Sequence, residues 1–378
     1  MTRNSTTRLR ALVLLAILIP VFAKANDSTA RPEVFEFKLP LGISSDVWNY
    51  YVPKTNPLTV AKIELGRRLF FDKRLSADMT VSCATCHDPD RAFTDGRRVS
   101  EGIGGKRGSR NSPTLLNAMF NSGQFWDGRV ESLEAQAKHP LVNPEEMGSQ
   151  THDQIVQRLQ AAPDYAAQFQ EVFGTPVTID AVAKAIASFE RTLVSGNSPL
   201  DRYTAGDLNA LSESARSGLI LFRTRGRCSI CHAFNQAFPF LTDGNYRNTG
   251  VSAGFAGFDG LARRAAAAAQ DDSLPALLKQ PGSVELGRFA VTGNLLDIGA
   301  YRTPSLRNVE LTAPYFHDGS AATLADVVKF YVNGGRENLY RDWQLEPVNL
   351  SEDEQRDVVE FLKALTSDDA RRVMRNAH

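Results

Sequence analysis

Two copies of one short motif contain all four cysteines of the chain. Each copy places two cysteines three positions apart with a histidine directly after the second, at residues 83–87 and 228–232. Two thiols at this spacing reach the two vinyl groups on one edge of a porphyrin, and the adjacent histidine can then ligate the iron. The residues are Cys83, Cys86 and His87 in the first copy and Cys228, Cys231 and His232 in the second.

Other chemistries of paired cysteines fit this pattern less well. A thioredoxin-like redox pair does not require a histidine after it. A zinc site would more often place its two cysteine pairs about 15–20 residues apart, whereas these pairs begin 145 residues apart. We therefore predict two covalently bound haem c groups, with His87 and His232 as the proximal iron ligands.

The elements that position the motifs are predicted to be helices. The same pattern, Gly-x-x-Leu-Phe, precedes each motif, at Gly66–Phe70 and at Gly218–Phe222. This repeat predicts two units on one plan, an N-terminal domain over 57–205 and a C-terminal domain over 206–378, each of ordinary domain size. Apolar residues at helical spacing and N-cap signals support helices in both. The signals are the stripe Val182, Ile186, Phe189 and Leu193, the start at Ser212, the cap Thr323, and the capping box of Ser351 and Glu354.

The remaining sequence predicts long loops. It is rich in glycine, proline, asparagine and aspartate, and no run of alternating apolar residues predicts a strand. The expected fold class is therefore mainly α and loop-rich, with a large apolar cofactor completing the core. The alanine run 265–269, within 263–278, is interpreted as a surface helix without chemistry. The glycine cluster 102–106 lacks the Gly-Lys-Ser/Thr order of a phosphate loop.

Composition and the first residues bear on compartment and partners. The 378 residues are 42% hydrophobic with a formal net charge of zero, which excludes a mainly disordered chain and gives no support to a nucleic-acid binder. Three arginines, an apolar stretch over 11–22 and Ala23-Lys24-Ala25 predict a signal peptide over 1–25. A retained membrane anchor is the alternative, and the short run interrupted by Pro20 disfavours it. Residues 26–56 are expected to form an N-terminal extension. No other segment is long enough to span a membrane, and the expected location is the periplasm.

Several longer motifs carry a resemblance to a known family. They read Leu69-Phe-Phe-Asp72, Arg110-Asn-Ser-Pro-Thr114, Gln124-Phe-Trp-Asp-Gly-Arg129, Phe189-Glu-Arg-Thr192, Tyr301-Arg-Thr-Pro-Ser-Leu-Arg-Asn308 and Leu311-Thr-Ala-Pro-Tyr-Phe-His-Asp-Gly319. With the two cysteine motifs, the chain from about Pro57 to Leu365 resembles the bacterial di-haem cytochrome c peroxidases and their relatives of the MauG type. The resemblance implies two cytochrome c-like helical domains, the N-terminal haem being peroxidatic and the C-terminal haem its electron store.

The resemblance also implies roles for individual residues. Trp126 corresponds to the electron bridge between the haems, although by itself it would be interpreted as a core tryptophan. Glu146 corresponds to the distal carboxylate of the peroxidatic pocket, although Glu145-Glu146 alone would be a solvated surface pair, and Gln136 to a nearby distal amide. Asn111, Thr312 and Pro314 correspond to an interdomain calcium site, whose oxygen ligands suit that ion. His317 corresponds to a histidine near the haems, with a structural or electron-path role.

Two positions depart from the peroxidase pattern. Where the typical peroxidase has a histidine that closes the peroxidatic haem at rest, this chain has Ile103, so the N-terminal haem should be open without reductive activation. Where it has a methionine on the C-terminal haem, the aligned residue is Tyr331, as in the MauG type. A buried core tyrosine is the alternative. A phenolate ligand would stabilise the higher oxidation states of that iron.

Three functions are compatible with these residues. The first is a peroxidase that reduces hydrogen peroxide at the His87 haem through high-valent iron, with electrons from a small cytochrome c or cupredoxin passing from the His232/Tyr331 haem through Trp126. The second is MauG-like, peroxide-dependent oxidation of a protein substrate. The third is a non-catalytic di-haem electron carrier, which the absence of a distal histidine disfavours.

Overall fold

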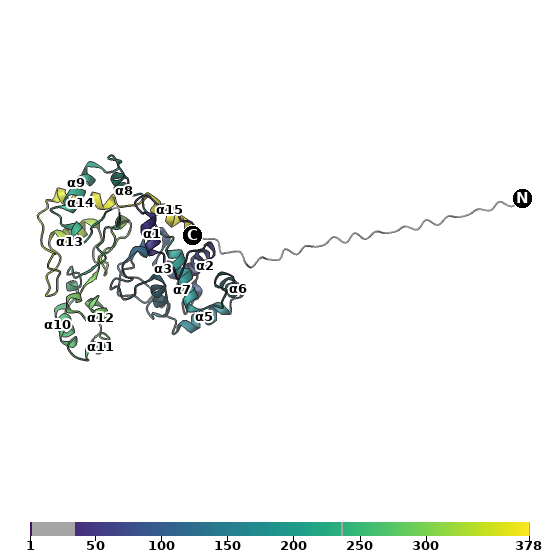
Figure 1. Ribbon diagram of the computed structural model, residues 1–378. Coiled ribbons are helices and arrows are strands. Elements are labelled where there is room, and N and C mark those ends of the chain that lie inside the picture. Colours follow the sequence, from purple (N-terminus) through teal and green to yellow (C-terminus); the bar gives the residue numbers. More distant parts are fainter. Residues whose placement is uncertain (2–34, 236, 378) are drawn as a thin grey trace. The chain divides into compact units, whose positions relative to one another are not determined.

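Nearly all of the regular secondary structure is helical, and long loops connect the helices, which confirms the predicted mainly-α class (Figure 1). The computed structural model describes Met1, residues 35–235 and residues 237–377; apart from Met1, the predicted signal peptide lies outside these ranges. Strands β1 (Tyr246–Arg247) and β2 (Tyr301–Arg302) pair antiparallel, with Tyr246 opposite Arg302. Within the described residues no helix is long and apolar enough to cross a membrane.

The helices are divided between the two parts of the chain before and after residue 205, here called the first and second halves. The first half contains α1 (Ser45–Tyr51), α2 (Val60–Phe71), α3 (Cys83–Cys86), α4 (Leu133–Val142), α5 (His152–Gln160), α6 (Pro163–Phe173), α7 (Ile179–Glu190) and α8 (Pro199–Thr204). The second half contains α9 (Glu213–Arg223), α10 (Phe258–Ala268), α11 (Leu274–Leu277), α12 (Phe289–Thr292), α13 (Leu324–Val332), α14 (Glu352–Lys363) and α15 (Asp368–Asn376).

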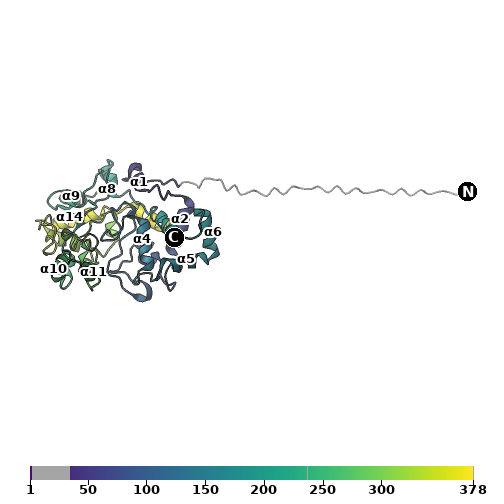
Figure 2. The same ribbon diagram turned by 60° about the horizontal axis from the view of Figure 1, so that its bottom comes forward.

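The repeated Gly-x-x-Leu-Phe pattern serves one helix crossing in each half. In the first half α2 packs against α7, and a Cβ on Gly66 would lie 1.9 Å from the carbonyl oxygen of Ala185. In the second half α9 packs against α14, beside which it lies in Figures 1 and 2, and a Cβ on Gly218 would lie 2.0 Å from the carbonyl oxygen of Asp357. Glycine therefore lets two helix backbones touch directly ahead of each cysteine motif.

Replacing the second of these glycines by alanine should destabilise the protein. We expect Gly218→Ala to lower the free energy of unfolding by about 1–3 kcal/mol, because the new methyl group must displace the backbone of α14. Gly260→Ala is the matched control, since nothing lies closer than 3.7 Å to a Cβ there and alanine favours a helix over glycine. Urea unfolding of both variants provides the measurement, and equal midpoints would contradict the crossing argument.

The predicted helix signals are confirmed at their caps. The Ser212 side chain accepts from the Ala215 N–H at the start of α9, and Thr323 and Ser351 form capping boxes with Asp326 and Glu354 at the starts of α13 and α14. The stripe predicted from Val182 to Leu193 is buried throughout, although α7 ends at Glu190, one turn before Leu193.

The alanine-rich segment is not the plain surface helix that the sequence suggested. Ala265 and Ala268 of α10 are buried, and they pack with Phe258, Leu286 and Phe289 in a separate small core. The other buried members of this core are Leu261, Ala262, Leu277 and Ile298. Small side chains allow this face of α10 to pack closely against the cluster, while Arg263, Arg264 and Ala267 are exposed. The segment is therefore a surface helix with one buried face.

Contacts join the two halves at several places. Phe120 stacks on Phe240 with ring centroids 4.3 Å apart, and the N-terminal extension adds Tyr51 against Phe120. Arg307 donates to Asp201 at 2.7 and 2.8 Å, both side chains being buried. The C-terminal helix α15 contributes to the core around Phe70 and Phe93 in the first half. The predicted boundary at 205/206 remains a prediction.

Candidate functional site

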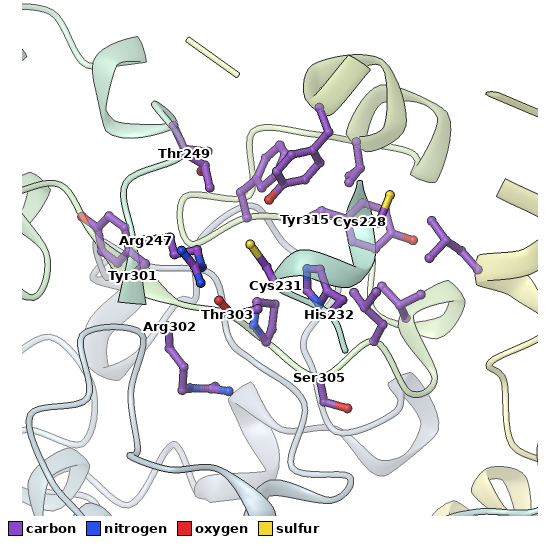
Figure 3. A pocket seen from close by; sticks show the side chains of 18 of the residues that line it. Cys228, Cys231, His232, Arg247, Thr249, Tyr301, Arg302, Thr303, Ser305 and Tyr315 are labelled. Carbon is purple, nitrogen blue, oxygen red and sulfur yellow. The ribbon is translucent and has the colours of Figure 1, made fainter. Parts of the chain in front are cut away.

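The second cysteine motif opens into a cavity (Figure 3). Cys228, Cys231 and His232 line it, directly after α9 and the turn that follows it. The Nδ1 atom of His232 lies 2.8 Å from the carbonyl oxygen of Leu241. Because a carbonyl oxygen only accepts, the proton must be on Nδ1, and Nε2 keeps its lone pair. Fixing the tautomer in this way orients a histidine as a metal ligand.

Tyr331 lines the same cavity from α13. Phe316 and Phe330 contact its ring at centroid distances of 6.2 and 5.4 Å. Burial raises the pKa of the Tyr331 phenol, and the nearby Cys231 and Cys228 thiols act in the same direction. A hydrogen bond with Thr249 opposes this rise, but no cation among the described residues is a cause that lowers the Tyr331 pKa. A ferric haem in the cavity would supply that positive charge, so the donor set of His232 and Tyr331 fits a haem iron.

The first cysteine motif is organised in the same way. Its cysteines form the short helix α3, and the His87 Nδ1 atom lies 3.0 Å from the carbonyl oxygen of Phe93 and 3.2 Å from Ser112 Oγ. Burial lowers the pKa of His87, which keeps the ring neutral as metal ligation requires. Cys83 packs with Phe70 and other apolar residues around it. Both motifs therefore present a histidine of fixed tautomer, as two haem c groups need.

Trp126 connects the surroundings of the two histidines. Its ring lines the cavity that contains His232. Its indole N–H donates to the carbonyl oxygen of Asn111 at 2.9 Å, and the next residue, Ser112, contacts the His87 ring. The Trp126 carbonyl oxygen accepts from the Arg302 backbone N–H at 2.8 Å. The hydrogen bond to Asn111 therefore fixes the indole on the segment that contacts His87, and both this segment and Trp126 line the second cavity.

Glu146 lies in the turn that follows α4. The Asn143 side-chain amide donates to its Oε1 at 2.8 Å. Burial raises the pKa of the Glu146 carboxyl, while the charge of Arg129 and the hydrogen bond from Asn143 act against this rise. Cys86 Sγ lies 3.9 Å from the Glu101 carbonyl oxygen, and Ile103 in the same segment contacts the Glu146 backbone, so this segment connects Glu146 to the first motif. Glu145, by contrast, is exposed. The pair is therefore not simply a solvated surface pair.

Ile103 packs against the turn that carries Glu146. Its backbone N–H donates to the Glu146 carbonyl oxygen at 2.8 Å. A Cβ on Gly102 would lie 2.1 Å from the Glu145 carbonyl oxygen, and a Cβ on Gly148 would lie 2.9 Å from the Ile103 side chain. The glycine cluster thus permits close packing of two turns, a role that the sequence interpretation missed.

Among the described residues, the structure gives Gln136 no direct link to Glu146, whereas it places the three predicted calcium ligands around one cavity. Gln136 lies half-buried on α4, and no hydrogen bond between described residues joins its side chain to Glu146. Asn111, Thr312 and Pro314 all line the cavity that contains Tyr331. The Asn111 amide donates to the Arg97 carbonyl oxygen at 2.9 Å, which leaves the acceptor oxygen of that amide for a cation.

His317 belongs to a buried polar network that the sequence did not reveal. Its ring stacks on Tyr301 with centroids 3.6 Å apart, and its Nε2 lies 3.2 Å from Glu285. Arg110 pairs with Glu285 at 2.9 Å and donates to the Tyr301 hydroxyl. Burial raises the pKa of Glu285, but the His317 hydrogen bond and the Arg110 charge outweigh it and lower the pKa to about 2. His317 therefore has a permanent anionic partner.

Besides Glu146, a second carboxyl, that of Glu190, influences the first motif. The sequence interpretation did not assign it a role. Its side chain is buried, and its Oε2 has no hydrogen-bond partner among the described residues. Burial raises its pKa to about 8 against the attraction of Arg191. Its position one residue after buried Phe189 in an amphipathic stripe was the available signal.

The Glu190 carboxyl should make stability fall as pH rises. A raised pKa means that the folded protein holds a proton that the unfolded chain releases above about pH 4.5. This stabilisation is complete below that pH and is lost as pH rises through about 8. We expect Glu190→Gln to remove the decline, worth on the order of a few kcal/mol, in urea unfolding followed from pH 5 to 9.

Glu134→Gln is the control with the opposite sign. Arg191 donates to both Glu134 oxygens at 2.8 Å. Although burial opposes it, this pairing lowers the pKa of Glu134. Its contribution is therefore lost as pH falls. Burial is the main cause of the raised Glu190 pKa and the Glu134 charge a smaller one, so removing Glu134 should reduce the alkaline decline without abolishing it. A decline that survives in Glu190→Gln would contradict the assignment.

Comparisons with known proteins agree with this geometry. Residues 60–209 match the family model described as di-haem cytochrome c peroxidase. The chain is 38% identical over 320 residues to the methylamine utilization protein MauG of Methylorubrum extorquens, covering 84% of this chain and 82% of that protein. The chain belongs to the di-haem cytochrome c peroxidase family. Membership in this family implies two haem cofactors and makes the protein an oxidoreductase that uses peroxide.

Other members of the family are equally similar. The cytochrome c551 peroxidase of Nitrosomonas europaea is 38% identical over 318 residues, covering 84% of this chain and 83% of its own. Among solved structures, a MauG-like protein associated with microbial copper homeostasis superposes with a TM-score of 0.74 at 32% identity, covering 89% of this chain and 97% of that one. Relatives named as peroxidases and as MauG thus stand at the same distance from this chain.

Proposed function

We propose that the protein reduces hydrogen peroxide at the centre held by His87, with electrons drawn through Trp126 from the centre held by His232 and Tyr331. The observation that carries the proposal is the placement of Glu146 and Ile103. Glu146 is a half-buried carboxyl in a turn whose backbone accepts a hydrogen bond from Ile103, and isoleucine cannot ligate iron. When bound, haem c supplies the iron that binds peroxide and exchanges electrons with it.

Glu146 moves the proton in the peroxide step. It accepts a proton from one peroxide oxygen and returns it to the other, which then leaves as water. Burial raises the pKa of Glu146, which brings the carboxyl closer to the working pH, where a general acid–base group is most effective. The hydrogen bond from Asn143 occupies Oε1 of the carboxyl and leaves Oε2 for the peroxide.

Trp126 and Tyr331 serve the second centre. The indole bonds to the segment that contacts His87, and Trp126 also lines the second cavity, which suits electron transfer between the two centres. Tyr331 lines the same cavity as His232 and would offer an oxygen donor to a haem iron there. An anionic oxygen donor favours the oxidised states of iron, whereas a thioether favours the reduced state. The second centre is therefore proposed to give up an electron readily.

A MauG-like oxidation of a protein substrate is the second candidate. Ile103 and Tyr331 favour it, because both residues occupy positions where the MauG type departs from the typical peroxidase. The non-catalytic carrier is disfavoured, since it needs both irons six-coordinate and isoleucine offers no ligand. The oxygen atoms around Asn111 are proposed to hold a calcium ion. The predicted signal peptide supports a periplasmic location.

Two measurements test the proposal. The resting spectrum should contain one high-spin and one low-spin haem, and two low-spin haems would support the carrier. Peroxide turnover with a reduced cytochrome c should be rapid in the absence of any pre-reduction step. A protein that reacts with peroxide but takes no electrons from a cytochrome or a cupredoxin would favour oxidation of a protein substrate.

A further inference from the structure

Arginine side chains line the cavity of the second cysteine motif, and one of them differs from the others in its partners. Three have a carboxylate partner within the protein: the ion pairs are Arg227 with Glu346, Arg247 with Asp243 and Asp342, and Arg307 with Asp201. Within residues 35–235 and 237–377, no carboxylate pairs with the fourth arginine, Arg302. The cavity wall therefore carries one positive charge that the described part of the chain does not neutralise.

The Arg302 guanidinium is buried and only partly hydrogen-bonded. The residue is 7% exposed, and its Nη1 donates to the side-chain oxygen of Asn121, a neutral acceptor, at 2.9 Å. Its Nε has no hydrogen-bond partner among the described residues. Burial lowers the pKa of Arg302 to about 10, which still leaves the side chain charged at neutral pH. Arginine is almost never fully buried unless it is paired, because an uncompensated buried charge is strongly destabilising. The arrangement therefore indicates an anion that the chain does not supply.

Backbone hydrogen bonds fix the position of Arg302. The residue belongs to β2, where it lies opposite Tyr246 of β1. Its backbone N–H donates to the carbonyl oxygen of Trp126 at 2.8 Å, and Trp126 lines the same cavity. Figure 3 shows the Arg302 side chain among the residues that line the cavity, together with Cys231 and His232. The unpaired cation is therefore held by a constrained segment that is bonded to the backbone of Trp126.

A haem in this cavity would bring an anion of the right chemistry. Membership in the di-haem family implies a haem c at this motif, where Cys228 and Cys231 hold the vinyl edge of the ring. The same ring carries two propionate carboxylates at another edge. A guanidinium binds a carboxylate through two parallel N–H···O bonds. The Nε–H and the neighbouring Nη2–H of an arginine form such a pair of donors, and in Arg302 the bond to Asn121 uses neither of them.

We propose that Arg302 binds a propionate carboxylate of the haem held by Cys228, Cys231 and His232. The contact fixes that edge of the haem to the β2 segment, which is bonded to Trp126. It also places a positive charge beside the haem. Because this charge favours the more negative, reduced state, Arg302 raises the reduction potential of the second centre and opposes the effect of an anionic oxygen ligand. The inference depends on the two haems of the family and is independent of the proposed peroxidase function.

Redox titration and resonance Raman spectroscopy of the holoprotein test the proposal. Arg302→Gln removes the charge and should lower the equilibrium constant for one-electron reduction of the second centre by about tenfold, which corresponds to a potential about 59 mV lower. The propionate bending bands should shift as well, because they respond to hydrogen bonds at the carboxylate.

Arg288→Gln is the matched control. Arg288 donates to the carbonyl oxygens of Asp127 and Gly128 and lies over the ring of Tyr246, the residue opposite Arg302. It is half-buried, has no carboxylate partner among the described residues, and does not belong to the lining of the cavity. Its substitution removes the same charge without touching the haem, so the potential should change by less than half as much and the propionate bands should not shift.

Inorganic phosphate distinguishes a haem propionate from a free anion. At constant ionic strength, added phosphate should leave the potential and the propionate bands of wild type unchanged. A wild-type potential that depends on phosphate, with no such dependence in Arg302→Gln, would overturn the proposal in favour of a free anion. Wild-type potential and bands in Arg302→Gln would also overturn it. If the glutamine variant does not fold, Arg302→Lys decides: lysine keeps the charge but cannot form two parallel bonds, so a shifted propionate band supports the proposal and an unshifted band overturns it.

Discussion

Glu146→Gln should slow the reaction with peroxide by about 10²–10⁴-fold, the usual contribution of a general acid–base group. Both haems should stay attached, because Glu146 hydrogen-bonds through its side chain only to Asn143 among the described residues, and its backbone contact to Ile103 survives the change. Stopped-flow mixing of the resting holoprotein with peroxide gives the rate directly.

The pH dependence separates the proton-transfer role from a structural one. Because burial raises the Glu146 pKa above its ordinary value of 4.5, the wild-type rate should rise with pH along a limb that lies above pH 4.5. The glutamine variant should lack this limb. Glu145→Gln, a change at the exposed neighbour, should match wild type in rate and profile. Equal rates for the two variants would remove Glu146 from the mechanism.

Ile103→His should close the peroxidatic centre at rest. A histidine in this turn would have the ligand that isoleucine lacks, and a preference of about 3 kcal/mol for the closed state would leave roughly one molecule in a hundred open. We therefore expect a low-spin resting spectrum at both centres and an approximately 100-fold slower reaction with peroxide. Reduction of the second centre beforehand should restore much of the rate.

Ile103→Val serves as the control for packing. It keeps an apolar side chain beside Gly148 and should retain a high-spin resting centre and near wild-type reactivity. If the histidine variant stays high-spin and fast, Ile103 does not occupy the position of a distal ligand. The openness of the first centre would then need another explanation.

The sequence predicted the parts of this structure that depend on local chemistry. Caps such as Thr323 and Ser351 specify helix starts through side-chain hydrogen bonds to nearby backbone, so they are legible in a few residues. The cysteine motifs are equally local. Placing Tyr331 in the cavity of His232 needed the family resemblance, since the two residues come from segments far apart in the chain.

Features that depend on distant packing could not be predicted. Gly66 and Gly218 are explained only by the helix each one touches, Ala185 and Asp357 being their contacts. Ala265 looked like part of a solvated run, and only the surrounding α11 and α12 make it core. The partners of His317 come from three separate segments. No pattern within one segment predicts contacts between residues that are far apart in the chain.

Electron paramagnetic resonance of wild type and Tyr331→Phe, before and after addition of peroxide, tests the central claim most directly. The account predicts one high-spin signal and one low-spin signal in resting wild type, and a changed low-spin signal in the variant alone. Tyr315→Phe, which alters another tyrosine of the same cavity, should behave as wild type. After peroxide, wild type should lose both signals while the variant keeps the signal of its second centre. An unaltered low-spin signal in resting Tyr331→Phe would contradict the account.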